Sequence, residues 1–172
     1  MENNITIRQA VVTDVVDIIR HKRIVLQENA SFMGRTAKEY QPTVEEELAR
    51  IRRHQTETGL MLVAVNREEV VGMLTFSRPQ RPHYSHNGMF GMSIQERFTN
   101  QRLGYKLLNE LLMFAKNDEA IKKISLEVYA HNERAISLYK RLGFIVEGRK
   151  PYHRKESDGS YVEDVLMSKI LT

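Results

Sequence analysis

The sequence predicts a mixed α/β, or α+β, domain in which one twisted sheet carries helices on both faces. Two observations lead to this class. Short polar links at residues 66–69 and 158–159 join apolar runs in the manner of antiparallel hairpins. Between them, a strand, a helix and a strand follow one another over residues 89–129, as in a parallel βαβ unit. The predicted order is β-α-α-β-β-β-α-β-α-β-β, in one domain spanning residues 1–172.

Strands are predicted where apolar and polar residues alternate, or where short apolar runs end in turn residues. The first strand shows the alternation most clearly, and the central ones are almost continuously apolar. The predicted strands span residues 5–10, 60–65, 70–76, 89–94, 121–129 and 161–170, and a further strand is predicted to begin at 144–147.

Four helices are predicted from apolar residues that recur every three or four positions. The first starts after Thr13, and the second follows a capping box formed by Thr43 and Glu46. Asn132 is the expected N-cap of the last helix, and Gly143 ends it. The predicted helices span residues 13–26, 44–54, 102–116 and 132–142.

Composition excludes several classes of protein. The chain has 172 residues, 26 Lys and Arg against 22 Asp and Glu, and a net charge of +4, which favours anionic ligands. The sequence has no dense block of Lys and Arg of the kind that indicates nucleic-acid binding. The absence of cysteine rules out disulfides, thiolate metal sites and a cysteine nucleophile. Scattered histidines predict no metal site, and with no leader or long apolar run we expect a cytoplasmic protein that contacts no membrane.

One stretch has the form of an anion-binding site. A short strand over 89–94 passes through a polar loop into a helix, whose first N–H groups and dipole favour negative charge. Arg97, Arg102 and Lys106 in and after the loop suit phosphate oxygens. An ordinary connection between a strand and a helix is the alternative interpretation.

Two segments resemble the GNAT superfamily of acyl-CoA-dependent N-acetyltransferases: FTNQRLGYKLL, and further on ISLEVYAHNERAISLYKRLGF. The phosphate-loop pattern of this family, Arg/Gln-x-x-Gly-x-Gly/Ala, falls on residues 99–104. Only Gly104 matches it. Thr99 stands where the family has Arg or Gln, and Arg102 stands where the family has Gly. The second segment matches the C-terminal motif of the family at every anchor position: Asn132, Ala135, Leu138, Tyr139, Gly143 and Phe144.

The resemblance implies that acetyl-CoA binds as co-substrate, without a metal. Its pantetheine arm is expected to enter a gap between the strand at 89–94 and the strand at 121–129, and its pyrophosphate to bind the loop that follows. The residues implied in binding acetyl-CoA are Met92, Ser93, Ile94, Thr99, Asn100, Gln101, Arg102, Leu103, Gly104, Tyr105 and Asn132.

Two residues are candidates for the chemistry of acetyl transfer. Tyr139 is the candidate general acid that protonates the departing thiolate, and packing in the core is its alternative role. Glu127 is the candidate general base for the amine, because some members of the family have a glutamate at this spacing. A solvent-facing glutamate with water as the base is the alternative.

The acceptor amine is less clear from the sequence. Residues 28–42 and 78–86 are expected to shape its pocket, with Glu28 and His86 as candidate contacts. Amino acids, polyamines, aminated antibiotics and protein N-termini all remain open as acceptors. Without cysteine, transfer is expected to be direct, in a ternary complex. A non-catalytic acyl-CoA-binding module is the rival interpretation, and a homodimer is one assembly that the resemblance allows.

Overall fold

The computed structural model describes residues 4–172 and has the mixed α+β architecture expected from the sequence. Apart from three short 3-10 turns, its elements follow the order β-α-α-β-β-β-α-β-α-β-β. The strands are β1 (Ile5–Gln9), β2 (Gly59–Asn66), β3 (Glu69–Ser77), β4 (Asn87–Ile94), β5 (Lys123–Tyr129), β6 (Ile145–Lys155) and β7 (Tyr161–Ile170). The helices are α1 (Val15–Glu28), α2 (Val44–Arg53), α3 (Leu103–Lys116) and α4 (Glu133–Arg141).

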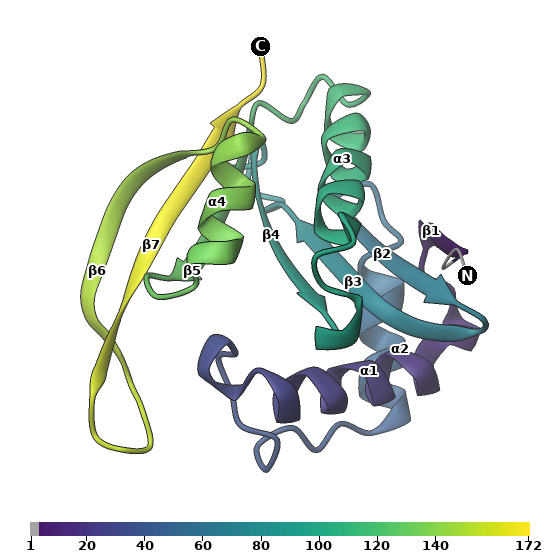
Figure 1. Cartoon of the computed structure of the whole chain (residues 1–172). Coiled ribbons are helices and arrows are strands. Elements are labelled where there is room, and N and C mark those ends of the chain that lie inside the picture. Colours follow the sequence, from purple (N-terminus) through teal and green to yellow (C-terminus); the bar gives the residue numbers. More distant parts are fainter. Residues whose placement is uncertain (1–3) are drawn as a thin grey trace.

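The seven strands form one sheet in the order β1-β2-β3-β4-β5-β7-β6. Neighbouring strands are antiparallel except β4 and β5, which are parallel and are joined through α3. This is the βαβ unit predicted from the sequence. It places the connection between β4 and α3 at the centre of the molecule (Figure 1).

The two parallel strands pair over only a short length. Asn87, Gly88 and Met89 lie beside Lys123, Ile124 and Ser125, and the pairing ends there. Beyond Met89, β4 continues to pair with β3 as far as Ile94, while β5 continues to pair with β7 as far as Tyr129. The strands therefore separate at their C-terminal ends, toward α1 (Figure 1). The backbone edge of 90–94 that faces β5 is left without a strand partner.

Two hydrophobic cores lie on opposite faces of the sheet. Alternate residues of β2 belong to different cores: Leu62 packs with the α3 side, and Val63 with the α1 and α2 side. Because both faces of the central strands are covered, their sequences are continuously apolar. Figure 1 shows α3 and α4 on one face and α1 and α2 on the other.

The predicted helix ends are confirmed with one exception. The Thr43 hydroxyl accepts a hydrogen bond from the Glu46 N–H, the Asn132 side chain accepts one from Ala135 N–H at 3.3 Å, and Gly143 has a φ of +86°. The first helix, however, starts at Val15 with Asp14 as its N-cap, instead of directly after Thr13. Asp14 binds the Arg8 guanidinium and the Val11 N–H, which holds the preceding residues in a 3-10 turn.

The strand predicted to begin at 144–147 does so, and β6 runs from Ile145 to Lys155. Its residues are mostly exposed and do not alternate, because β6 is an edge strand with two irregularities in its pairing with β7. Pro151 fits such an edge. Among residues 4–172, no helix is both long enough and apolar enough to cross a bilayer.

Candidate active site

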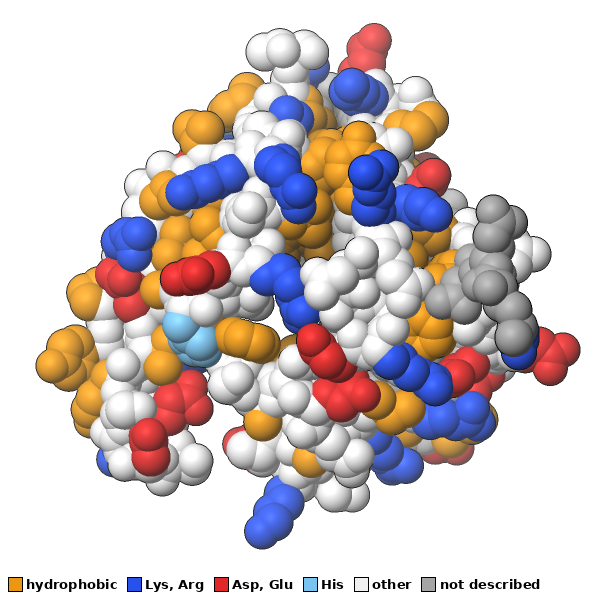
Figure 2. Space-filling model, in the orientation of Figure 1, with side chains coloured by type: hydrophobic (Ala, Val, Ile, Leu, Met, Phe, Trp, Pro, Cys, Tyr) orange, Lys and Arg blue, Asp and Glu red, His pale blue; other side chains and the backbone are white. Residues whose placement is uncertain are grey.

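A first cavity of about 600 Å³ opens where β4 separates from β5. Its walls come from the end of β4, the turn into α3, the N-terminal part of α4 and the C-terminal end of α1. Figure 2 shows the surface hollowed between the part that carries α4, β6 and β7 and the part that carries α1. Basic side chains gather over α3 and α4 beside this opening (Figure 2).

Most of the residues predicted to bind acetyl-CoA line this first cavity. Gln101 lies outside the lining, and its side chain donates a hydrogen bond to the Arg97 carbonyl at 3.0 Å. The structure therefore brings together a set that the sequence distributes over three elements. The predicted residues in the lining are Met92, Ser93, Ile94, Thr99, Asn100, Arg102, Leu103, Gly104, Tyr105 and Asn132.

The turn into α3 has the backbone of a tight anion-binding loop. Asn100 and Arg102 both have a positive φ, of 59° and 60°, and Arg102 is the N-cap. The first N–H groups of α3 have no acceptor within the helix. A Cβ on Gly104 would lie 2.9 Å from Leu138 Cδ2, so a larger residue here would displace the end of the Leu138 side chain where α3 meets α4. The left-handed conformation of Arg102 explains why the family favours glycine at this position.

The cations near this cavity differ from those expected. Arg97 pairs with Glu69 at 2.6 Å and stacks on Phe98, so it is turned away from the cavity. Arg134 and Arg141 of α4 line the cavity beside Arg102, although the sequence analysis did not single them out. Their positions on the same helix face as Leu138 are the signal that identifies them.

Tyr139 lies at the base of the cavity and is buried. Its ring packs edge-on against Phe90, with centroids 5.7 Å apart, and against Phe144 at 6.1 Å. Removal from water raises the pKa of the Tyr139 phenol to about 12, because burial disfavours the charged phenolate. The phenol is therefore protonated at neutral pH, as a proton donor must be.

A second cavity of about 400 Å³ lies on the α1 and α2 face of the sheet. It is lined by α1, α2, the segment between them and the separated ends of β4 and β5. Both cavities include Met92 and Ser93 of β4, and Asn132 and Tyr139. They therefore meet at the gap between β4 and β5.

The segment between α1 and α2 covers the second cavity. Tyr129 of β5 donates a hydrogen bond from its hydroxyl to the Met33 carbonyl at 2.9 Å. The His131 ring contacts the Ser31 carbonyl at 3.0 Å and stacks on Phe32. These contacts attach residues 31–33 to the C-terminal end of β5, so part of the predicted 28–42 segment lines the second cavity.

Four cations line the second cavity, and the sequence analysis identified none of them as site residues. Lys22 pairs with the buried Glu47, and Arg50 lies 4.0 Å from the same carboxylate. Burial lowers the pKa of the Lys22 ammonium to about 8. The other two come from different parts of the chain. They are Arg35, which lies 5.9 Å from the ring centroid of Tyr40, and Arg154, which pairs with the buried Asp164 at 3.2 Å.

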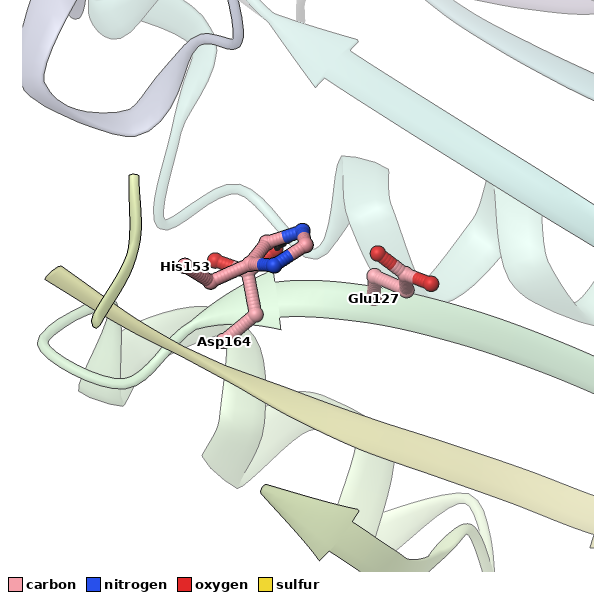
Figure 3. A group of neighbouring side chains, drawn as sticks. All are labelled: Glu127, His153 and Asp164. Carbon is pink, nitrogen blue, oxygen red and sulfur yellow. Dashed lines mark ion pairs between the residues drawn. The ribbon is translucent and has the colours of Figure 1, made fainter. Parts of the chain in front are cut away.

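Glu127 lines the second cavity from β5 and accepts a hydrogen bond from Lys150 at 2.7 Å. Its carboxylate lies within 4.8 Å of ligand atoms of His153 and Asp164, a grouping that resembles a metal site. Figure 3 shows the His153 ring over Asp164, with Glu127 on the neighbouring strand. Because Arg154 and Lys150 neutralise these carboxylates, the group is better described as an ion-pair network than as a metal site.

The two predicted acceptor contacts lie outside both cavities. The Glu28 carboxylate accepts a hydrogen bond from the Glu96 N–H at 2.9 Å and so stabilises the turn after β4. His86 precedes β4, and its carbonyl accepts hydrogen bonds from the N–H groups of Lys122 and Lys123. The loop at 78–86 enters β4 at its N-terminal end, whereas both cavities open at the opposite end of that strand.

A sheet with parted parallel strands, an open helix N-terminus and a buried tyrosine together define an acyl-CoA-dependent acetyltransferase. Residues 26–144 match the Acetyltransferase (GNAT) family, and the chain belongs to this family. The assignment confirms the class expected from the sequence, an N-acetyltransferase with acetyl-CoA as co-substrate.

The chain is 34% identical over 110 residues to the L-amino acid N-acetyltransferase AaaT of Escherichia coli (strain K12). The aligned residues make up 63% of this chain and 67% of AaaT. Its fold is similar to that of an acetyltransferase of the GNAT family from Streptococcus pneumoniae, with a TM-score of 0.93 and 24% identity. The superposition covers 98% of this chain and 100% of the other. It is also similar to the structure of yncA from Salmonella typhimurium with its cofactor acetyl-CoA, at a TM-score of 0.86 and 20% identity. That superposition covers 98% of this chain and 95% of yncA.

Proposed function

We propose that the protein transfers an acetyl group from acetyl-CoA to the primary amine of a small molecule that carries a carboxylate. An amino acid is the simplest acceptor of this kind. The observation that carries the proposal is the junction of two cavities at Tyr139, one suited to acetyl-CoA and the other lined by cations. The two substrates would meet there in a ternary complex.

The first cavity supplies what acetyl-CoA requires. The open N–H groups at the start of α3, with Arg102, Arg134 and Arg141, suit the phosphate oxygens. The unpaired edge of 90–94 offers backbone groups to the amides of pantetheine. The acetyl thioester would then lie beside Tyr139.

Tyr139 is proposed as the general acid. When the amine attacks the carbonyl carbon, the C–S bond breaks and sulfur leaves with the electron pair. The Tyr139 hydroxyl donates its proton to this sulfur. An ordinary thiol has a pKa of about 8.5, well below that of the buried phenol. The proton transfer is therefore favourable only together with loss of a proton by the attacking amine nitrogen.

Glu127 is proposed as the general base. It lines the second cavity, where the acceptor ammonium would lie, and takes the proton that nitrogen must lose before it attacks, directly or through one water. As the amide forms, the nitrogen loses its second proton, which restores the Tyr139 hydroxyl, and Glu127 releases its proton to solvent. The products are the N-acetyl amide, the CoA thiol and one proton. The chain has no cysteine to carry an acetyl group, which supports direct transfer.

The charges of the second cavity favour an acceptor with one cationic and one anionic end. Glu127 suits the ammonium, and the cations suit a carboxylate. Lys22 and Arg154 already pair with buried carboxylates, whereas Arg35 contacts an aromatic ring. Arg35 is therefore the cation best placed to bind the carboxylate of the acceptor. A polyamine would bring like charges together. AaaT is named as an L-amino acid N-acetyltransferase, which supports this acceptor class.

The test is release of the CoA thiol from acetyl-CoA with a panel of amines. The informative pair is an amino acid and its carboxamide, which differ only in the carboxylate. Spermidine, an aminoglycoside and a short peptide complete the panel. We expect the amino acid to exceed its carboxamide in kcat/KM by about tenfold or more, as expected for a hydrogen bond to a charged group.

Arg35→Ala is expected to remove most of that preference, mainly through KM for the acceptor. Arg53→Ala is the matched control, because Arg53 is an exposed arginine of α2 outside the cavity. A preference for spermidine would overturn the acceptor assignment. Binding of acetyl-CoA without thiol release from any amine would indicate a non-catalytic acyl-CoA-binding module instead.

A further inference from the structure

His21 of α1 is fully buried and faces the sheet. Its Nε2 lies 2.9 Å from the Ser93 hydroxyl oxygen of β4. Its Nδ1 has no hydrogen-bond partner in the described part of the chain. A buried ring with one nitrogen bonded and the other unpaired calls for a physical explanation.

The unpaired nitrogen determines the direction of this hydrogen bond. Burial lowers the pKa of His21 to about 4, so the ring is neutral at pH 7 and carries one N–H. Were the hydrogen on Nδ1, a buried donor would be left without an acceptor, which proteins rarely allow. With the hydrogen on Nε2, only a lone pair is left unpaired. Nε2–H therefore donates to Ser93 Oγ.

This direction leaves the hydroxyl proton of Ser93 free to donate elsewhere. Ser93 lies four residues after Met89, where β4 and β5 stop pairing, and it lines both cavities. Its position is thus the junction where the acetyl group and the amine would meet. A fixed donor at such a point stabilises charge that develops on a carbonyl oxygen during acyl transfer.

We propose that His21 is a positioning residue that orients the Ser93 hydroxyl to donate a hydrogen bond to the acetyl carbonyl oxygen during attack by the amine. The proposal rests on the proposed acetyl transfer and adds a side-chain donor to it. Ser93 would contact the reacting carbonyl, whereas His21 would act only through Ser93.

The test is a double-mutant cycle with steady-state kinetics. Ser93→Ala is expected to lower kcat about 100-fold, the usual effect of losing one such donor. KM for acetyl-CoA should change little. His21→Phe should lower kcat to a similar extent, and the double variant no further, because both changes remove one oriented donor. Ser93→Thr keeps the hydroxyl and should retain most of the activity.

Ser125→Ala is the matched control. Ser125 lies on the neighbouring strand, and its hydroxyl also bonds a side chain, that of Asn87 at 2.9 Å, but it lies outside both cavities. We expect its kcat to be unchanged. Thermal unfolding of each variant separates lost activity from lost folding.

Nitrogen-15 NMR of the histidine rings provides a readout independent of activity. A hydrogen on Nε2 of His21 is expected, and one on Nδ1 would overturn the proposal. So would multiplicative losses in the double variant, or an effect of Ser93→Ala confined to KM for the acceptor. If the wild-type protein acetylates no amine, the proposed function fails, while the NMR experiment still tests the hydrogen-bond direction.

Discussion

Met89 of β4 lies beside Ser125 of β5, and this is the last pair before the two parallel strands separate. Everything that we assign to the active site lies beyond this pair. The free edge of 90–94, Ser93 and the buried phenol of Tyr139 all border the resulting gap. The gap thus connects the first cavity, which we propose for acetyl-CoA, with the second cavity, which we propose for the acceptor.

Tyr139→Phe is expected to lower kcat about 100-fold or more, within the usual contribution of a general acid. The fold should be retained, because phenylalanine keeps the ring packed between Phe90 and Phe144. Stopped-flow kinetics and calorimetric titration with acetyl-CoA check both points. An unchanged kcat, or a lost affinity for acetyl-CoA, would contradict the acid role.

Glu127→Gln is expected to lower kcat/KM for the acceptor and to leave the affinity for acetyl-CoA unchanged, since Glu127 lines only the second cavity. About a 100-fold loss corresponds to a direct base. Glu147→Gln is the matched control, because Glu147 also pairs with a lysine, Lys123 at 2.6 Å, outside both cavities. If the two variants have equal activity, water acts as the base without help from Glu127.

Arg102→Gly is expected to stabilise the protein by about 1 kcal/mol, because glycine adopts the left-handed conformation of this N-cap without the strain of a side chain. That free energy corresponds to a rise in Tm of about 2–4 °C for a chain of this size. KM for acetyl-CoA should rise, since a guanidinium leaves the cavity. Asn100→Gly should have a smaller effect on Tm, because asparagine tolerates this conformation better. A lower Tm for Arg102→Gly would contradict the explanation.

Acidification is expected to destabilise the protein through His21. Between pH 6.5 and about 4 the unfolded chain binds a proton on this ring that the folded chain does not. The free energy of unfolding should therefore fall by about 1.4 kcal/mol per pH unit in this window from this group. Urea unfolding of wild type and His21→Phe at pH 7, 5.5 and 4.5 measures the difference. Equal slopes in the two proteins would show that the folded chain binds the proton as readily as the unfolded one.

Local patterns in the sequence predicted most of the fold. Helix stripes, the capping box at Thr43, the Asn132 cap and the turn at Gly143 depend on neighbours within a few residues, so they can be recognised without the tertiary structure. For β6 the pattern predicted only the start, because the exposed edge position removes the alternation on which strand prediction depends.

The lining of the first cavity, proposed to bind acetyl-CoA, was also largely predicted, because it follows from one strand-loop-helix segment and one helix. The acceptor side was not. Glu28 and His86 belong to the two segments expected to shape the acceptor pocket, yet Glu28 accepts a hydrogen bond from the Glu96 N–H and His86 lies at the far end of β4. Which end of a strand faces a cavity depends on the sheet as a whole.

The element order, the family and most of the lining of the first cavity could be predicted from the sequence, because they depend on short-range periodicity and on a contiguous motif. Only the tertiary structure decided which charges meet around the acceptor and which group holds Ser93. His21 and Ser93 are 72 residues apart, and Lys22, Arg50, Glu127 and Arg154 come from four different elements. Such contacts arise when helices pack across a sheet at a particular angle and register, which no local pattern records.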